Sequence, residues 1–130
     1  MKIIDIKTMK GPNYWSVRRH NLTVMVLDLE EMEQFPTNKI DGFGERLEKM
    51  FPSMYTHRCS VGKAGGFFQR VKQGTWMGHV IEHIALELQT LAGMDCGFGR
   101  TRGYGEEGVY FVVFNHMVGK VGRYTAEASF

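Results

Sequence analysis

The sequence is short of several features that would each place it in a broad class of proteins. It lacks a strong charge of one sign, and its net charge of +2 argues against a dedicated nucleic-acid binder, whose domain would usually be markedly basic. It has only two cysteines, Cys59 and Cys96, and no secretory signal pattern at its start, which indicates reduced thiols in a cytoplasm. No apolar run is long enough to span a membrane. We therefore expect a soluble, cytoplasmic protein.

The chain also lacks the phosphate-binding pattern of nucleotide enzymes. Residues 62–66 form a glycine-rich loop before a helical segment, an arrangement that can receive an anion on backbone N–H groups. The lysine pattern of a Walker loop is missing, so nucleotide binding is not expected. We interpret this loop as a flexible connection whose only expected contribution to function is to line a site.

What the chain does have is enough apolar sequence for one core. Its 130 residues are 43% hydrophobic, which predicts a single domain over residues 1–130. Strands are predicted at residues 2–9, 22–29 and 109–114. Residues 22–29 carry apolar side chains on both faces, which indicates a buried, central strand. The fold class is therefore predicted as α+β, with a small, mostly antiparallel sheet packed against helices.

Helices are predicted between and after these strands. Asp41 is expected to cap a helix that ends before Pro52, and Thr75 to cap a longer helix over residues 75–92 that Gly93 ends. Gly119 and Gly122 are expected to bracket a turn. A further helix is expected over residues 123–130.

The longest predicted helix carries the pattern H-x-x-E-H from His79 to His83. At about 100° per residue, His79 and His83 lie about 40° apart on the flank of the apolar stripe, with Glu82 beside them. Two imidazole ligands and a carboxylate base are what a zinc peptidase requires, here in the inverzincin order. The sequence therefore predicts His79 and His83 as metal ligands and Glu82 as the catalytic acid–base residue.

The third ligand is left open by the sequence. Glu87 lies one turn beyond His83 in the same row and is the first choice, and the rivals are Cys59, His57, Glu106 and Glu107. The alternative interpretation is an ordinary ion pair between His83 and Glu87 at i,i+4, with His79 a satisfied boundary histidine.

A second candidate site is the run Gly97-Phe98-Gly99-Arg100-Thr101-Arg102-Gly103. Arg100 and Arg102 lie between glycines, and their guanidinium groups can bind carboxylates through paired hydrogen bonds. The alternative is a solvated loop, which spacing alone slightly favours.

Taken together, these motifs strongly resemble the N-terminal domain of the cyanophycin synthetase family. The resemblance rests on four stretches that span nearly the whole chain: Gly11-Pro12-Asn13-Tyr14-Trp15-Ser16 with Arg18-Arg19-His20, Gly65-Gly66-Phe67, Gly78-His79-Val80-Ile81-Glu82-His83, and Gly97-Phe98-Gly99-Arg100-Thr101-Arg102. In that family the domain precedes ATP-grasp and Mur-ligase-like modules, which use ATP and Mg²⁺ to add Asp and Arg to a growing polymer. Neither module is present in this sequence.

The resemblance implies a partner and a cofactor. The domain would bind cyanophycin, a poly-Asp backbone bearing Arg side chains, with Arg100, Arg102, Arg18 and Arg19 as polymer-binding residues. In some members the H-x-x-E-H helix carries a zinc-dependent peptidase-like site that cuts polymer into primers. His79 and His83 match its ligands and Glu82 its catalytic acid. The parent enzyme is expected to be a homo-oligomer, and neither nucleic acid nor a membrane is an expected partner.

Overall fold

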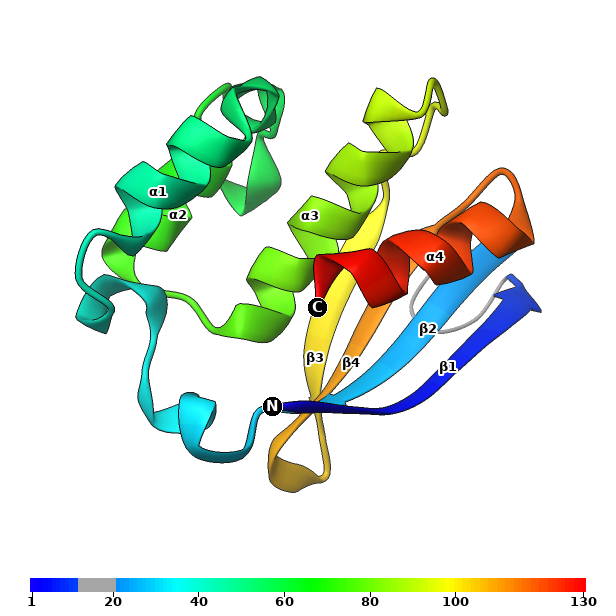
Figure 1. Cartoon of the computed structure of the whole chain (residues 1–130), viewed down its shortest axis with the longest axis horizontal. Helices are drawn as coiled ribbons and strands as arrows, with labels where there is room; N and C mark the ends of the chain where they lie inside the picture. Colours follow the sequence, from blue (N-terminus) through cyan, green and yellow to red (C-terminus); the bar gives the residue numbers. More distant parts are fainter. Residues whose placement is uncertain (12–20) are drawn as a thin grey trace.

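The computed structural model describes residues 1–11 and 21–130 as a four-stranded antiparallel sheet with helices (Figure 1). The strands are β1 (Lys2–Lys10), β2 (Asn21–Asp28), β3 (Gly99–Tyr104) and β4 (Glu106–Asn115). The α-helices are α1 (Phe43–Met50), α2 (Gly66–Gln73), α3 (Met77–Leu91) and α4 (Gly119–Ser129). Four 3-10 helices complete the described elements: η1 (Glu30–Gln34), η2 (Thr37–Lys39), η3 (Pro52–Thr56) and η4 (Cys59–Val61). The predicted α+β class is confirmed.

The sheet has the strand order β1-β2-β4-β3, so that β1 and β3 form its edges. Each neighbouring pair is antiparallel. The central position predicted for the second strand is confirmed, because six of the eight residues of β2 are buried. Its side chains alternate between two clusters, Met25 and Leu27 on one face and Leu22 and Val24 on the other. The edge position of β3 leaves this strand open to the neighbouring cleft.

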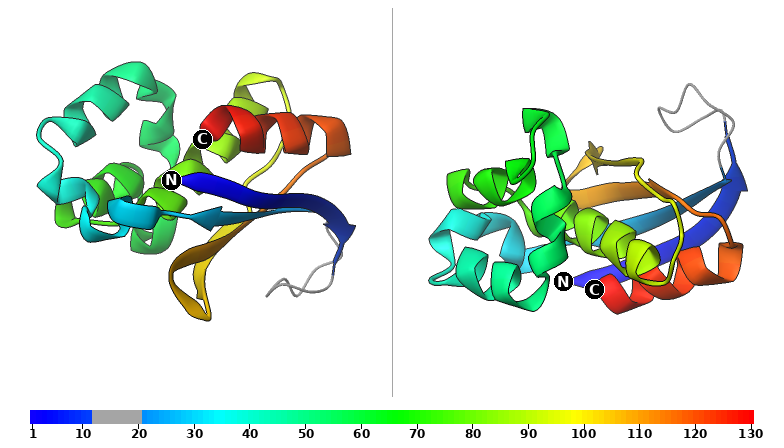
Figure 2. Two further views of the ribbon diagram at one scale, coloured as in Figure 1. Left: turned by 60° about the horizontal axis from the view of Figure 1, so that its bottom comes forward. Right: turned by 90° about the horizontal axis from the view of Figure 1, so that it is seen from above.

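Helices α3 and α4 pack side by side against the same face of the sheet (Figure 2). Helix α3 crosses β3 and β4, and α1 and α2 lie on its other side (Figure 1). Gly78 permits the close approach of α3, because a Cβ at this position would lie 3.2 Å from Cγ2 of Thr101. As a result α3 is buried on most of its circumference, and Glu82, His83 and Glu87 are among its buried residues.

Two predicted helix caps are wrong. Helix α3 begins after Trp76 with no side-chain cap, because the Thr75 hydroxyl bonds Nδ1 of His79 at 2.9 Å instead of a backbone N–H. Helix α1 begins after Gly42, which adopts the left-handed conformation with φ of 60°, and Asp41 makes no cap bond. The predicted C-terminal signal is confirmed at Gly93, whose φ is 81°.

Two further boundaries differ from the sequence predictions. The run predicted as a loop over residues 97–103 contains most of β3, because residues 99–103 pair with β4. The predicted turn at Gly119 and Gly122 is the first part of α4, where Gly122 lets the helix approach Thr23 and His116 closely. Within the described residues, no helix has the length and apolar content needed to cross a membrane.

Candidate functional site

A cleft of about 1060 Å³ lies between α3, the edge strand β3 and the segment over residues 56–60. Helix α3 contributes His79, Glu82 and His83 to its lining, and β3 contributes residues 99–102. The H-x-x-E-H motif and the arginine run, which are far apart in the sequence, therefore face one another across a single cavity. This arrangement depends on β3 being an edge strand beside the buried helix.

Three side chains that could hold a metal ion meet in this cleft. Suitable donor atoms of Cys59, His79 and His83 all lie within 4.8 Å of one another. The Cys59 sulfur is 3.3 Å from Nε2 of His79, whose other ring nitrogen bonds Thr75 at 2.9 Å. A hydrogen bond of this kind on the far nitrogen fixes the orientation of a ligating imidazole. Two imidazoles and a thiol form a donor set that suits zinc.

The position of Cys59 is set by an unusual backbone geometry. Cys59 opens η4 with a left-handed φ of 51°, which is uncommon for a residue with a side chain. The preceding Arg58 carbonyl lies directly against Gly66 at the start of α2, where a Cβ would clash with it. Gly66, the second glycine of the Gly65-Gly66-Phe67 stretch, thus makes room for the turn that brings Cys59 next to His79.

The two imidazoles of α3 are held in a mostly apolar environment around Phe67. The ring of His83 stacks on Phe67 with centroids 4.1 Å apart, and His79 meets Phe67 edge-on at 5.9 Å. Burial lowers the pKa of His79 to about 4 and that of His83 to about 2, with smaller contributions from neighbouring positive charge. Both imidazoles are therefore neutral near pH 7, which is the protonation state that binds a metal.

The carboxyl group of Glu82 is enclosed between α3 and β3. It is 5% exposed and accepts a hydrogen bond of 2.6 Å from the Thr101 hydroxyl. Gly99 makes room for it, since a Cβ there would lie 2.5 Å from Oε1 of Glu82. Burial raises the pKa of Glu82 to about 7, although the Thr101 hydrogen bond opposes the shift. A carboxyl with this pKa can exchange protons near neutral pH, as a general acid–base catalyst must.

The raised pKa of Glu82 predicts that its replacement by glutamine stabilises the metal-free chain increasingly as pH rises. The folded state binds the proton more tightly than the unfolded state, so the stability that this group provides is lost between pH 4.5 and about 7. Glutamine does not titrate, and the histidines are common to both proteins. Glu82→Gln should match the wild type near pH 4.5 and exceed it by roughly 2–3 kcal/mol near pH 7.5. Urea unfolding in chelator measures the difference, and a pH-independent difference would contradict the prediction.

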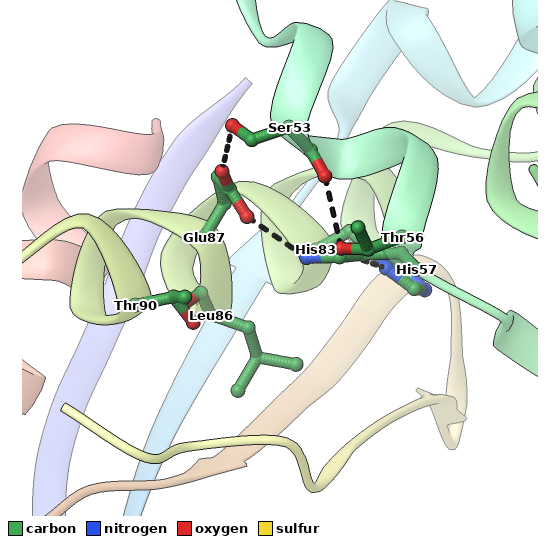
Figure 3. Close-up of polar contacts among 7 residues, drawn as sticks. All are labelled: Ser53, Thr56, His57, His83, Leu86, Glu87 and Thr90. Carbon is green, nitrogen blue, oxygen red and sulfur yellow. Dashed lines mark hydrogen bonds and ion pairs between the residues drawn. The ribbon is translucent and has the colours of Figure 1, made fainter. Parts of the chain in front are cut away.

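The other proposed third ligands are not part of the Cys59, His79 and His83 cluster, although His57 contacts His83. Glu87 is 1% exposed and binds His57 at 2.9 Å and Ser53 on η3 (Figure 3). The alternative His83–Glu87 ion pair is not formed, because His83 contacts His57 through their Nδ1 atoms at 2.9 Å. Glu106 and Glu107 are exposed at the start of β4 and do not line the cleft.

Arginine side chains dominate the charge of the cleft lining. Arg100 and Arg102 of β3 are joined there by Arg58 and Arg70, which the sequence did not single out. Glu82 is the one acidic residue among the described lining residues. The lining is therefore cationic, although the chain as a whole is nearly neutral. Arg18 and Arg19 lie outside the described residues.

Three positions that support the site were also missed by the sequence analysis: Thr75, Gly99 and Thr101. Thr75 was interpreted as a helix cap, whereas its spacing of four residues from His79 is also that of a side-chain partner. Gly99 and Thr101 belong to a strand that pairs across the cleft, so their proximity to Glu82 required the strand register.

Comparison with known proteins gives concordant matches. Residues 24–130 match the family model described as the cyanophycin synthase-like N-terminal domain. Over 129 residues, 99% of the chain, it is 53% identical to a cyanophycin synthetase of Trichormus variabilis and 51% identical to one of Synechocystis sp.. A cyanophycin synthetase of Geminocystis herdmanii is 52% identical over the same length. The chain spans only 14–15% of the length of these relatives.

Proposed function

Because the chain belongs to the cyanophycin synthase-like N-terminal domain family, we propose that its cleft binds cyanophycin and cleaves it at a zinc site. The observation that carries this proposal is the meeting of Cys59, His79 and His83 beside the buried carboxyl of Glu82. A metal-ligand set and a general base within one cavity form the minimum constellation of a zinc hydrolase. The substrate we propose is the Asp/Arg polymer cyanophycin, and the names of the relatives, cyanophycin synthetases, support this choice.

The residues fit zinc in number and in chemical type. Cys59, His79 and His83 would hold the ion, which leaves a fourth position for water or substrate, as catalytic zinc sites require. Bound zinc would supply Lewis acidity, polarising the scissile carbonyl and making a water nucleophilic near neutral pH. Cys59 replaces Glu87 as our choice of third ligand, because Glu87 is already engaged by His57 and Ser53.

The protein's own groups account for the proton transfers. Ionised Glu82 takes a proton from the attacking water, and its pKa of about 7 lets it return that proton to the leaving amine. Thr101 holds the carboxyl in place during both steps through its hydrogen bond to Oε2. The cationic lining orients a peptide that carries carboxylates, so that the bond to be cut lies at the α3–β3 junction.

Incubation of this chain with cyanophycin tests the cleavage directly. We expect shorter polymer fragments with new amino termini in the zinc-loaded protein and none after chelation. A matched incubation with poly-lysine controls for general proteolysis. Intact polymer after prolonged incubation of the zinc-loaded chain would refute hydrolysis.

Polymer binding is the second candidate function, and the cationic lining of the cleft favours it. In a parent synthetase the domain would hold the growing polymer for ATP-grasp and Mur-ligase-like modules that use ATP and Mg²⁺. Arg100, with Arg102 two residues along the same strand, would contact polymer carboxylates. If the chain binds polymer but neither cleaves it nor binds zinc, polymer binding is the function that remains.

Charge reversal at both arginines is expected to weaken polymer retention. Replacing Arg100 and Arg102 with glutamate removes two carboxylate-binding groups and introduces repulsion, so retention should fall at least about tenfold. A variant with Lys49 and Lys120 replaced by glutamate is the matched control, because both are exposed and lie outside the lining. Co-sedimentation with polymer at several salt concentrations gives the comparison. Equal retention of polymer by the two variants would show that Arg100 and Arg102 do not bind it.

A further inference from the structure

A hydrogen-bonded row of side chains extends from the metal-ligand group into the α1–α2 layer. It begins at His83, passes through His57 and Glu87, and ends at Ser53 on η3 (Figure 3). Glu87 is 1% exposed, and the His57 side chain is 15% exposed. Glu87 does not line the cleft, whereas His57 does. Neither residue has a role in the function proposed above.

We propose that Glu87 and His57 are positioning residues that hold His83 in the tautomer whose Nε2 lone pair is available to the metal. The inference rests on the proposed zinc function and extends it to two residues that do not themselves bind the ion. Both were considered above as rival ligands. The structure assigns them a role one and two hydrogen bonds away from His83.

The direction of each hydrogen bond follows from what the groups are able to donate. An ionised carboxylate only accepts, so Nε2 of His57 donates its proton to Glu87. A neutral imidazole has a single N–H, so Nδ1 of His57 is then an acceptor. With His57 neutral, the contact of 2.9 Å between the two Nδ1 atoms is a hydrogen bond that His83 donates from Nδ1. The remaining nitrogen of His83, Nε2, therefore carries the lone pair.

The surroundings make this polarity persistent. Ser53 donates its hydroxyl proton to Oε1 of Glu87, which keeps the carboxylate occupied at both oxygens. Phe67 stacks on the His83 ring with an interplanar angle of 24°, so the ring plane is fixed by packing while the tautomer is fixed by hydrogen bonding. Partners of this kind behind a ligating histidine typically contribute about 10–100-fold to metal affinity.

A purely structural role for Glu87 would give a different result. If Glu87 only linked α3 to η3, its loss would lower stability without changing the proton position on His83. The tautomer is therefore the decisive readout, and it is measurable in the metal-free chain.

The experiment measures histidine tautomers by ¹H–¹⁵N NMR and zinc affinity by competition with a chelator in three variants. Wild-type His83 should be protonated at Nδ1. Glu87→Leu and His57→Leu should each shift His83 toward protonation at Nε2 and weaken zinc binding about 10–100-fold. Thr56→Ala is the control, because the Thr56 hydroxyl bonds the Ser53 backbone carbonyl rather than Glu87, His57 or His83, and its zinc affinity should remain within about threefold of wild type.

The possible failures are distinguishable. Protonation of wild-type His83 at Nε2 would overturn this inference, as would a tautomer and a zinc affinity that neither leucine variant changes. If Glu87→Leu does not fold, His57→Leu supplies the same comparison, because it removes the same link to His83 and keeps the hydrogen bond from Ser53 to Glu87. Absence of zinc binding by the wild-type chain would overturn the proposed function and this role together, independently of the NMR result.

Discussion

Glu82→Gln is expected to abolish cleavage of cyanophycin while the protein still retains zinc. Glutamine has nearly the same shape and can still accept the Thr101 hydrogen bond, but it cannot take or return a proton at neutral pH. General acid–base catalysis typically contributes about 10²–10⁴-fold, so the cleavage rate should fall by at least that range. Fragment analysis with metal analysis of the same sample gives both quantities.

The control for this substitution is Glu107→Gln, because Glu107 is exposed on β4 and outside the cleft. It changes the net charge by the same amount and should cleave at the wild-type rate. Cleavage by Glu82→Gln at a rate close to wild type would show that Glu82 is not the catalytic acid–base residue. Loss of zinc from this variant would instead give Glu82 a role in holding the metal.

Cys59→Ala should lose stoichiometric zinc, whereas Cys96→Ala should keep it. Removal of a residue behind a ligand already costs about 10–100-fold in affinity, so removal of a direct ligand should cost roughly 100-fold or more. Cys96 is the control thiol, since it bonds Gln89 rather than Cys59, His79 or His83. Chelator competition on both variants measures the difference.

The same pair of variants decides between the rival ligands. If Cys59→Ala binds zinc as tightly as the wild type, the third ligand is one of the other candidates, and Glu87→Leu becomes the variant to compare. Unfolding curves of both cysteine variants in chelator provide the stability control. They show whether a loss of zinc affinity comes from the missing ligand or from a general loss of folded structure.

The parts of the fold that could be predicted from the sequence are those that have a local cause. Apolar side chains on both faces predicted β2 and its central position, and helical spacing with Gly93 predicted α3 to within two residues. The wrong predictions have other causes. The Thr75 hydroxyl bonds the His79 side chain one turn along the helix instead of a backbone N–H. Gly122 serves a close tertiary approach to Thr23 and His116, which overrides the local preference for a turn.

The candidate site divides in the same way. His79, Glu82 and His83 belong to one helix, so their spacing alone brings them together. Cys59 reaches them only through a left-handed backbone turn against Gly66, which no periodic pattern encodes. Glu87 follows His83 in the helical row and was for that reason the first choice of ligand, yet its partner is His57, from a segment distant in sequence.

Anomalous scattering at the zinc edge from crystals of this chain tests the central claim most directly. We predict a single strong peak within bonding distance, about 2.0–2.3 Å, of the Cys59 sulfur and one nitrogen each of His79 and His83. We predict none beside Glu87. A peak absent from this position in zinc-soaked crystals, or one bonded to Glu87 instead of Cys59, would contradict the account.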